Sequence, residues 1–257
     1  MFIDAPEATL YATSSGSGGD LPIVGIGGWI GSSELWAEPF SILSRSMRTV
    51  AYDHRGSGVS IAAAASITLE NLVDDLFLVL DACGIERCVL AAESAGALTA
   101  LAAALRDPVR IARLVIVDGM YHRGIDPAGD PFLQGLRTAY PATLARFVEL
   151  CVPEKDSAHI KRWGRQIIDR AEPDAAIALR ICGSEVDIRG SIARITQPTL
   201  IIHGDQDAIV PLQQARDLAA SISGSRLVIL EGAGHVPTLT QPAAVADAIT
   251  AFLLEGA

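Results

Sequence analysis

Three side chains of the sequence have the types that acyl transfer requires, and they occur in the order serine, aspartate, histidine. Ser94 stands between small residues at the end of an apolar run, while Asp207 and His235 follow two later apolar runs. A serine hydroxyl becomes nucleophilic at neutral pH when a histidine takes its proton and an acid orients that histidine. The sequence therefore predicts Ser94 as nucleophile, His235 as general base and Asp207 as orienting acid.

The residues around Ser94 are typical of a sharp strand–turn–helix. Ala92 and Gly96, two positions before and after the serine, are both small, as a strained turn requires. A helix that follows such a turn points its N-terminal N–H groups at the same place, where they can stabilise an oxyanion. A serine also serves as a simple helix N-cap. The pattern alone leaves both interpretations open, and the presence of Asp207 and His235 favours the nucleophile.

Apolar runs predict the strands that must position these residues. They cover residues 8–14, which are expected to form an edge strand, and residues 21–26, 49–52, 88–92, 114–117, 199–204 and 227–230. Helical patterns lie near 33–43, 67–82, 97–105, 212–220 and 242–254. Alternation of strands and helices favours an α/β fold, with a mostly parallel twisted sheet flanked by helices. Functional groups in such a sheet gather beyond the carboxyl ends of the strands. The three side chains are therefore expected to meet at one edge.

Residues 120–190 interrupt this alternation. Strand patterns stop there, and helical patterns separated by prolines take over for roughly 70 residues. This length exceeds a simple crossover, so we expect a helical cap inserted between two sheet strands, over the functional edge. The predicted domains are a core of residues 1–119 and 191–257 and a cap of residues 120–190.

Composition limits the classes of protein that the chain can belong to. Half of its 257 residues are hydrophobic and 19% are charged, which permits a large core, and the net charge of −10 argues against nucleic acid and anionic membranes as partners. The four cysteines show no metal or redox spacing, and the N-terminus lacks a secretory pattern. We expect a soluble cytoplasmic protein. The sequence does not indicate its oligomeric state.

Five segments together make the chain resemble the α/β-hydrolase superfamily, and within it the small single-cap esterases, lactonases and perhydrolases. The segments span nearly the whole chain, in the family's order: Gly27-Gly28-Trp29 with Trp36, Asp53 to Ser60, Ala92 to Gly96, Gly204 to Asp207, and Gly234-His235. Each segment alone is weak evidence, whereas five in register are specific. The resemblance implies a cofactor-free serine hydrolase that cleaves a small carboxylic ester or lactone through an acyl-enzyme on Ser94.

The resemblance also implies an oxyanion hole. Its donors would be the backbone N–H groups of Trp29 and Ala95, and the Trp29 side chain would line the substrate pocket. Gly27-Gly28 replaces the family's usual His-Gly, so the hydrogen bond from that histidine is absent and the donor could shift by one residue. Glu93 is expected to point away from the substrate. The segment 53–60 would be a structural turn, with no chemical role for Arg55.

Other acids and histidines compete for the roles in the triad. Asp118 ends the strand after the nucleophile strand, where some family members carry their acid, and Asp205 is a weaker rival. We favour Asp207, because Gly204-x-x-Asp207 followed by Val210-Pro211 matches the usual loop. The remaining histidines are interpreted as structural, loop or cap residues: His54, His122, His159 and His203.

Substrate choice is expected to depend on the cap. Its aromatic residues could wall an apolar acyl pocket, or simply pack: Tyr121, Phe132, Tyr140, Phe147 and Trp163. The same triad could also serve C–C bond hydrolysis or perhydrolysis, and a hydrolase-fold receptor would bind its ligand instead of consuming it. Gly56-x-Gly58 lacks the third glycine and the following helix of a dinucleotide site. We therefore expect no cofactor and no metal.

Overall fold

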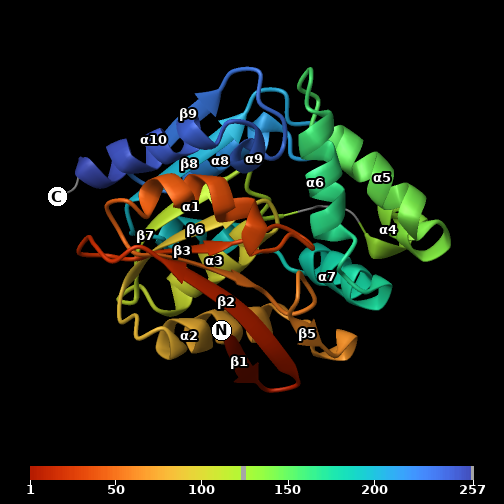
Figure 1. Cartoon of the computed structure of the whole chain (residues 1–257), viewed down its shortest axis with the longest axis horizontal. Helices are drawn as coiled ribbons and strands as arrows, with labels where there is room; N and C mark the ends of the chain where they lie inside the picture. The colour runs from red at the N-terminus through yellow and green to blue at the C-terminus, as the bar shows by residue number, and fades with distance from the viewer. Residues whose placement is uncertain (123–125, 256–257) are drawn as a thin grey trace.

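The computed structural model describes residues 1–122 and 126–255, and its central element is one sheet with helices on both faces (Figure 1). The hydrogen-bonded strand order is β1-β2-β4-β3-β6-β7-β8-β9, and β5 pairs with β2. The strands are β1 Phe2–Ala5, β2 Ala8–Ser15, β3 Ile23–Ile26, β4 Thr49–Asp53, β5 Ile61–Ala62, β6 Cys88–Glu93, β7 Ile111–Val117, β8 Thr199–Gly204 and β9 Arg226–Leu230. All pairs from β4 to β9 are parallel, which confirms the predicted α/β class.

The N-terminal strands differ from the prediction. The run at residues 8–14 is not an edge strand, because β2 pairs antiparallel with β1 on one side and with β4 on the other. A tight turn with Glu7 at φ +57° connects β1 to β2. With four residues and an exposed Phe2, β1 is too short to give a clear alternating pattern in the sequence.

Helices cover the two faces of the sheet, since side chains of successive strand residues point to opposite sides. Ile23 packs in the core cluster that includes residues of α1 and α10, whereas Val24 packs with residues of α2, α3 and α8. The helices of the core are η1 Ser33–Trp36, α1 Ala37–Leu43, η2 Ala64–Ser66, α2 Leu69–Ala82, α3 Gly96–Arg106, α8 Leu212–Ser221, α9 Pro237–Thr240 and α10 Pro242–Leu254.

A group of helices separates β7 from β8. It consists of η3 Pro127–Gly129, α4 Pro131–Thr138, α5 Tyr140–Cys151, α6 Ala158–Ile168, α7 Pro173–Glu185 and η4 Arg189–Arg194. In Figure 1, α4 to α7 lie together at one side of the sheet. The predicted cap at 120–190 includes residues 123–125, which lie outside the described residues. Within the described ranges, no helix has the length and apolar character needed to cross a membrane.

One buried ion pair and one buried hydrogen bond stabilise this helical group. Arg180 of α7 lies 2.6 Å from Asp130, which caps the N-terminus of α4, and both side chains are largely buried. Trp29 Nε1 donates to the Ala176 carbonyl of α7 over 2.8 Å. The loop after β3 is therefore joined directly to the inserted helices.

Candidate active site

Ser94 occupies the tight turn between β6 and α3. Its φ of +51° is a conformation that non-glycine residues rarely adopt. Two backbone hydrogen bonds of 2.9 Å stabilise it, from Ser94 N–H to the Val117 carbonyl and from Met120 N–H to the Ser94 carbonyl. A Cβ at Gly96 would lie 2.5 Å from the Gly27 carbonyl oxygen, so only glycine fits there. The small residues noted in the sequence thus allow a strained serine between two strand ends.

The structure brings Ser94, His235 and Asp207 into one hydrogen-bonded chain. Ser94 Oγ lies 2.8 Å from His235 Nε2, and His235 Nδ1 lies 2.8 Å from Asp207 Oδ2. The serine and histidine side chains are almost entirely buried. This geometry lets the imidazole accept the serine proton while its other nitrogen donates to the carboxylate.

The Asp207 carboxylate is held in its charged form. Burial by itself raises its pKa, but the charge of His235 and three hydrogen bonds outweigh this effect, so the pKa lies below its usual range. Besides the bond from His235, the carboxylate accepts backbone N–H groups from Ile209 at 2.7 Å and Val210 at 3.0 Å. These bonds also fix the orientation of the carboxylate.

The loop that carries His235 is packed against the end of α5 and the segment after it. His235 N–H donates to the Cys151 carbonyl over 2.8 Å, and Gly234 N–H donates to Glu154 Oε1 over 2.7 Å. A Cβ at Gly234 would lie 2.3 Å from the ring of Pro153. The position of the general base therefore depends on the inserted helices as well as on the sheet.

The loop Gly27-Gly28-Trp29 passes next to Ser94. A Cβ at Gly28 would lie 2.9 Å from Ser94 Cβ and 2.5 Å from a carboxylate oxygen of Glu93. His54 Nε2 donates to the Gly28 carbonyl over 2.9 Å, and Gly31 N–H donates to the same oxygen over 3.1 Å. Sequence reasoning missed this role of His54. Its position within the turn at 53–60 was the available signal, because that turn was expected to support the site.

The turn at residues 53–60 is anchored by side chains. Asp53 accepts backbone N–H groups from Ser33 and Val59 at 2.7 and 2.8 Å. Arg55 forms a bidentate ion pair with Asp75 of α2, with N–O distances of 2.6 and 2.7 Å. Neither side chain exposes more than 1% of its surface. An unpaired charge here would be costly, whereas the pair fixes the turn that carries His54.

Asp118 lies at the end of β7, close to the acid of the triad, but it does not contact His235 in the manner of Asp207. Its Oδ1 accepts the Gly204 N–H over 2.8 Å and lies 3.4 Å from His203 Nδ1. Burial, followed by the negative charge of Asp207, raises the pKa of Asp118 well above its usual range. Asp205 instead accepts the Gly232 N–H over 2.7 Å.

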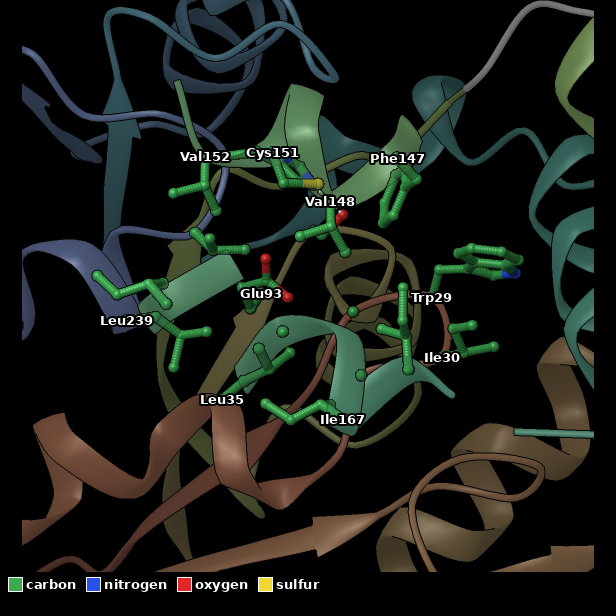
Figure 2. A pocket seen from close by; sticks show the side chains of 18 residues that line it. Trp29, Ile30, Leu35, Glu93, Phe147, Val148, Cys151, Val152, Ile167 and Leu239 are labelled. Carbon is green, nitrogen blue, oxygen red and sulfur yellow. Dashed lines mark hydrogen bonds between the residues drawn. The ribbon is translucent and has the colours of Figure 1, made fainter. Parts of the chain in front are cut away.

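A mostly apolar cavity of about 50 Å³ opens beside Ser94 (Figure 2). Its walls come from the loop after β3, η1, the turn at Ser94, α5, α6 and α9, and include Trp29, Ile30, Leu35, Phe147, Val148, Cys151, Ile160, Gly164, Ile167 and Leu239. Glu93 lies on this wall too, which corrects the expectation that it points away from the substrate. Burial raises the pKa of Glu93 to about 7.

The predicted aromatic residues occupy different places. Trp29 and Phe147 line the cavity and meet edge to face with ring centroids 5.4 Å apart. The other four lie outside its lining. Phe132 meets Trp29 edge to face, and Tyr121 is buried with the α2–α3–α8 cluster. Tyr140 donates to the Ala171 carbonyl, and Trp163 packs against the cluster on the α1 face. In an amphipathic helix the side that meets the substrate and the side that meets the core look alike in sequence.

One group in the described part of the chain has the atom types of a metal site. Asp118, His203 and Asp207 each offer one atom, all within 4.8 Å of one another. Asp207 is already committed to His235 and to two backbone N–H groups, and His203 Nε2 lies 3.0 Å from the Val210 carbonyl. We therefore describe this group as the acid side of the triad.

The order of the strands, the tight turn at Ser94 and the geometry of Ser94, His235 and Asp207 define a protein of the α/β-hydrolase class. The model of the Alpha/beta hydrolase family matches residues 23–248, and the chain belongs to this family. A pimeloyl-(acyl-carrier protein) methyl ester esterase from Nitrosomonas europaea is 29% identical over 252 residues, with 91% of this chain and 96% of the relative aligned.

Solved structures of similar proteins agree with this assignment. A hydrolase from Pseudomonas aeruginosa superposes with a TM-score of 0.91 at 26% identity, covering 98% of this chain and 97% of the other. The enol-lactonase from Burkholderia xenovorans also gives a TM-score of 0.91, at 25% identity, covering 99% and 100%. The protein is thus an enzyme of hydrolase type, similar to esterases and lactonases.

Proposed function

We propose that this enzyme cleaves a small carboxylic ester or lactone through an acyl-enzyme formed on Ser94. The observation that carries the proposal is the hydrogen-bonded chain from Ser94 Oγ through His235 to Asp207, with both distances at 2.8 Å. The position of the serine at a helix N-terminus adds electrostatic support. Cleavage of esters or lactones by the similar enzymes named above agrees with the proposal.

The proposed reaction begins when Ser94 Oγ attacks the substrate carbonyl and His235 Nε2 takes the serine proton. The negative oxygen that forms is stabilised by the N–H groups of Ala95 and Trp29. His235 then gives the proton to the departing alkoxide oxygen, and the acyl-enzyme remains. Water then attacks the acyl carbon while His235 Nε2 takes its proton, and His235 returns that proton to Ser94 Oγ as the bond to the serine breaks and the acid leaves. In a lactone the alcohol stays attached to the acyl chain, and the product is a hydroxy acid.

The cavity argues for a short acyl group. A volume of about 50 Å³ holds only a few heavy atoms, and most of its lining is aliphatic or aromatic. Phe147 and Val148 of α5 close one side, and Ile167 of α6 closes another (Figure 2). We therefore expect acetyl to butyryl esters, and lactones of similar size, to be preferred over long-chain esters.

Labelling of the nucleophile and turnover of esters together test the proposal. The protein is treated with a fluorophosphonate probe, and the labelled peptide is identified by mass spectrometry. The same preparation is assayed with p-nitrophenyl acetate, butyrate and octanoate and with a panel of lactones. Ser94→Ala is the control. We expect label on Ser94 and turnover of the short substrates, both lost in the variant.

Two outcomes contradict the proposal. Absence of both label and turnover would remove the hydrolase mechanism from Ser94. Label on Ser94 after a single slow turnover, with no multiple turnover on any substrate, would point to a ligand-binding protein with the same fold.

The proposal places the enzyme in the cytoplasm, where the four free thiols of the chain stay reduced.

A further inference from the structure

Asp118 places a second carboxyl group beside the acid of the triad. Its side chain has no exposed surface, and one atom each of Asp118, Asp207 and His203 lie within 4.8 Å of one another. Two charged carboxylates this close in a buried space repel each other strongly, so one of them holds a proton. The hydrogen bonds around the pair show which one it is.

Asp207 is the charged member of the pair. It accepts hydrogen bonds from His235, Ile209 and Val210, and each of these favours the charged form. Asp118 accepts one backbone N–H, from Gly204, and within the described ranges its Oδ2 has no hydrogen-bond partner. The proton therefore belongs on Asp118.

His203 leads independently to the same assignment. Its Nε2 lies 3.0 Å from the Val210 carbonyl, which can only accept, so Nε2 carries a hydrogen. Burial lowers the pKa of His203, so the ring is neutral and Nδ1 presents a lone pair. Nδ1 lies 3.4 Å from Asp118 Oδ1 and, like Asp118 Oδ2, has no hydrogen-bond partner in the described part of the chain. A charged Asp118 would leave His203 Nδ1 and both carboxylates as acceptors with no hydrogen between them, whereas a protonated Asp118 brings one O–H into this group.

We propose that Asp118 is a positioning residue that keeps its proton throughout the reaction and donates it in a hydrogen bond to the Asp207 carboxylate. The inference rests on the proposed function, in which Asp207 orients His235. The donated bond spreads the negative charge of Asp207 and limits how strongly this carboxylate stabilises the His235 imidazolium. The general base then remains neutral, and ready to accept the serine proton, at neutral pH.

The groups that face Asp118 come from three parts of the sheet edge. They are Asp207 and His203 from β8 and the loop after it, Glu93 from the end of β6, and the backbone N–H of Gly204. His235 acts on this group through Asp207. Substitution of Asp118 leaves all of these groups in place, so a difference between the pH profiles of the wild type and an Asp118 variant is due to the side chain of Asp118.

The acidic limb of the pH profile of kcat/KM tests the proposal with two variants. Asp118→Asn keeps a neutral side chain with an N–H donor and a C=O acceptor, and asparagine tolerates the φ of +46°. We expect its acidic limb to stay within about 0.3 pH units of the wild type, because neither side chain is charged. Asp118→Gly tolerates the same φ but removes the donor, and we expect its acidic limb to move to higher pH.

Two results of the pH profiles would overturn the proposal. A shift of the Asp118→Asn limb to lower pH by about one unit would mean that a negative charge had been removed. A Gly variant that matches the wild type would show that no donated hydrogen bond matters. Thermal unfolding of both variants checks that they fold.

Nitrogen-15 NMR of histidine-labelled wild-type protein gives a test that does not depend on activity. His203 is identified by the loss of its signals in His203→Gln. We expect a neutral ring at pH 7 with its hydrogen on Nε2, and an imidazolium or an Nδ1–H form would overturn the assignment. If ester turnover fails while this result holds, the proposed function falls and the proton on Asp118 stands.

Discussion

His54 Nε2 lies 2.9 Å from the carbonyl oxygen of Gly28, so a histidine in the turn after β4 holds the loop after β3. In a trans peptide the C=O and the following N–H point in opposite directions. Fixing the Gly28 carbonyl therefore fixes the N–H of Trp29, one of the two proposed oxyanion donors. The sequence lacks the family's histidine within this loop, and His54 supplies a hydrogen bond to it from another segment.

The first prediction concerns this bond. His54→Phe keeps a planar aromatic side chain but removes the donor to Gly28, so the Trp29 N–H loses its fixed direction. Since loss of one oxyanion donor costs about 10²–10³ in kcat, we expect this indirect loss to lower kcat about 10-fold to 100-fold with little change in KM. Steady-state kinetics with p-nitrophenyl acetate measures the effect.

The matched control is His159→Phe, because His159 is exposed on α6. It should retain full activity. A His54→Phe enzyme with normal kcat and an unchanged melting temperature would remove His54 from the support of the oxyanion hole.

The second prediction separates the acids. In Asp207→Asn the carboxylate that orients His235 Nδ1 is replaced by a neutral amide, which stabilises the wrong tautomer. We expect kcat to fall about 10³-fold to 10⁴-fold. Asp205→Asn is the control, since Asp205 accepts the Gly232 N–H outside the triad, and its kcat should change less than about twofold. A larger loss in Asp205→Asn than in Asp207→Asn would contradict the assignment.

The third prediction concerns the stability contributed by Glu93. Burial raises the pKa of this carboxyl from 4.5 to about 7, so the folded protein holds a proton that the unfolded chain releases. The contribution of Glu93 to the free energy of unfolding is therefore fully present below pH 4.5 and is lost as the pH rises to 7. Over this window the free energy of unfolding should fall by about 3 kcal/mol relative to Glu93→Gln, which has no such proton.

Chemical denaturation of the wild type and of Glu93→Gln at several pH values between 4.5 and 8 measures this difference. Both proteins share every other titrating group, so the difference between the two curves isolates Glu93. A constant difference across the range would mean that Glu93 titrates near its ordinary value in the folded state.

Most of the sheet could be predicted from the sequence, whereas parts of the site could not. Ser94, Asp207 and His235 follow apolar runs, and parallel strands bring the ends of such runs to one edge. Glu93 lies beside Gly28 and on the cavity wall, a position that depends on the packing of two loops and that residue types do not specify. The role of His54 depends on two loops that lie 26 residues apart in the chain. Asp118 looks like a rival acid in sequence, and only its distances to His203 and Gly204 show the difference.

The last prediction uses a helical glycine of the cavity wall, Gly164 of α6. A Cβ added there would lie 3.6 Å from Val148 Cγ1, an ordinary contact, so Gly164→Ala fits without strain. The added methyl group occupies part of a cavity of about 50 Å³, while alanine favours the helix by up to about 1 kcal/mol. The enzyme should therefore become more stable and more selective for short acyl groups.

The ratio of kcat/KM for p-nitrophenyl acetate to that for the butyrate measures the selectivity of Gly164→Ala. We expect it to rise at least about fivefold, because one methyl group in a fixed pocket discriminates by about 1–3 kcal/mol. Gly190→Ala is the control: a Cβ there meets open space, and Gly190 lies outside the cavity lining. An unchanged ratio in a folded Gly164→Ala enzyme would place the acyl group elsewhere, and the cavity beside Ser94 would then lose its role in substrate selection.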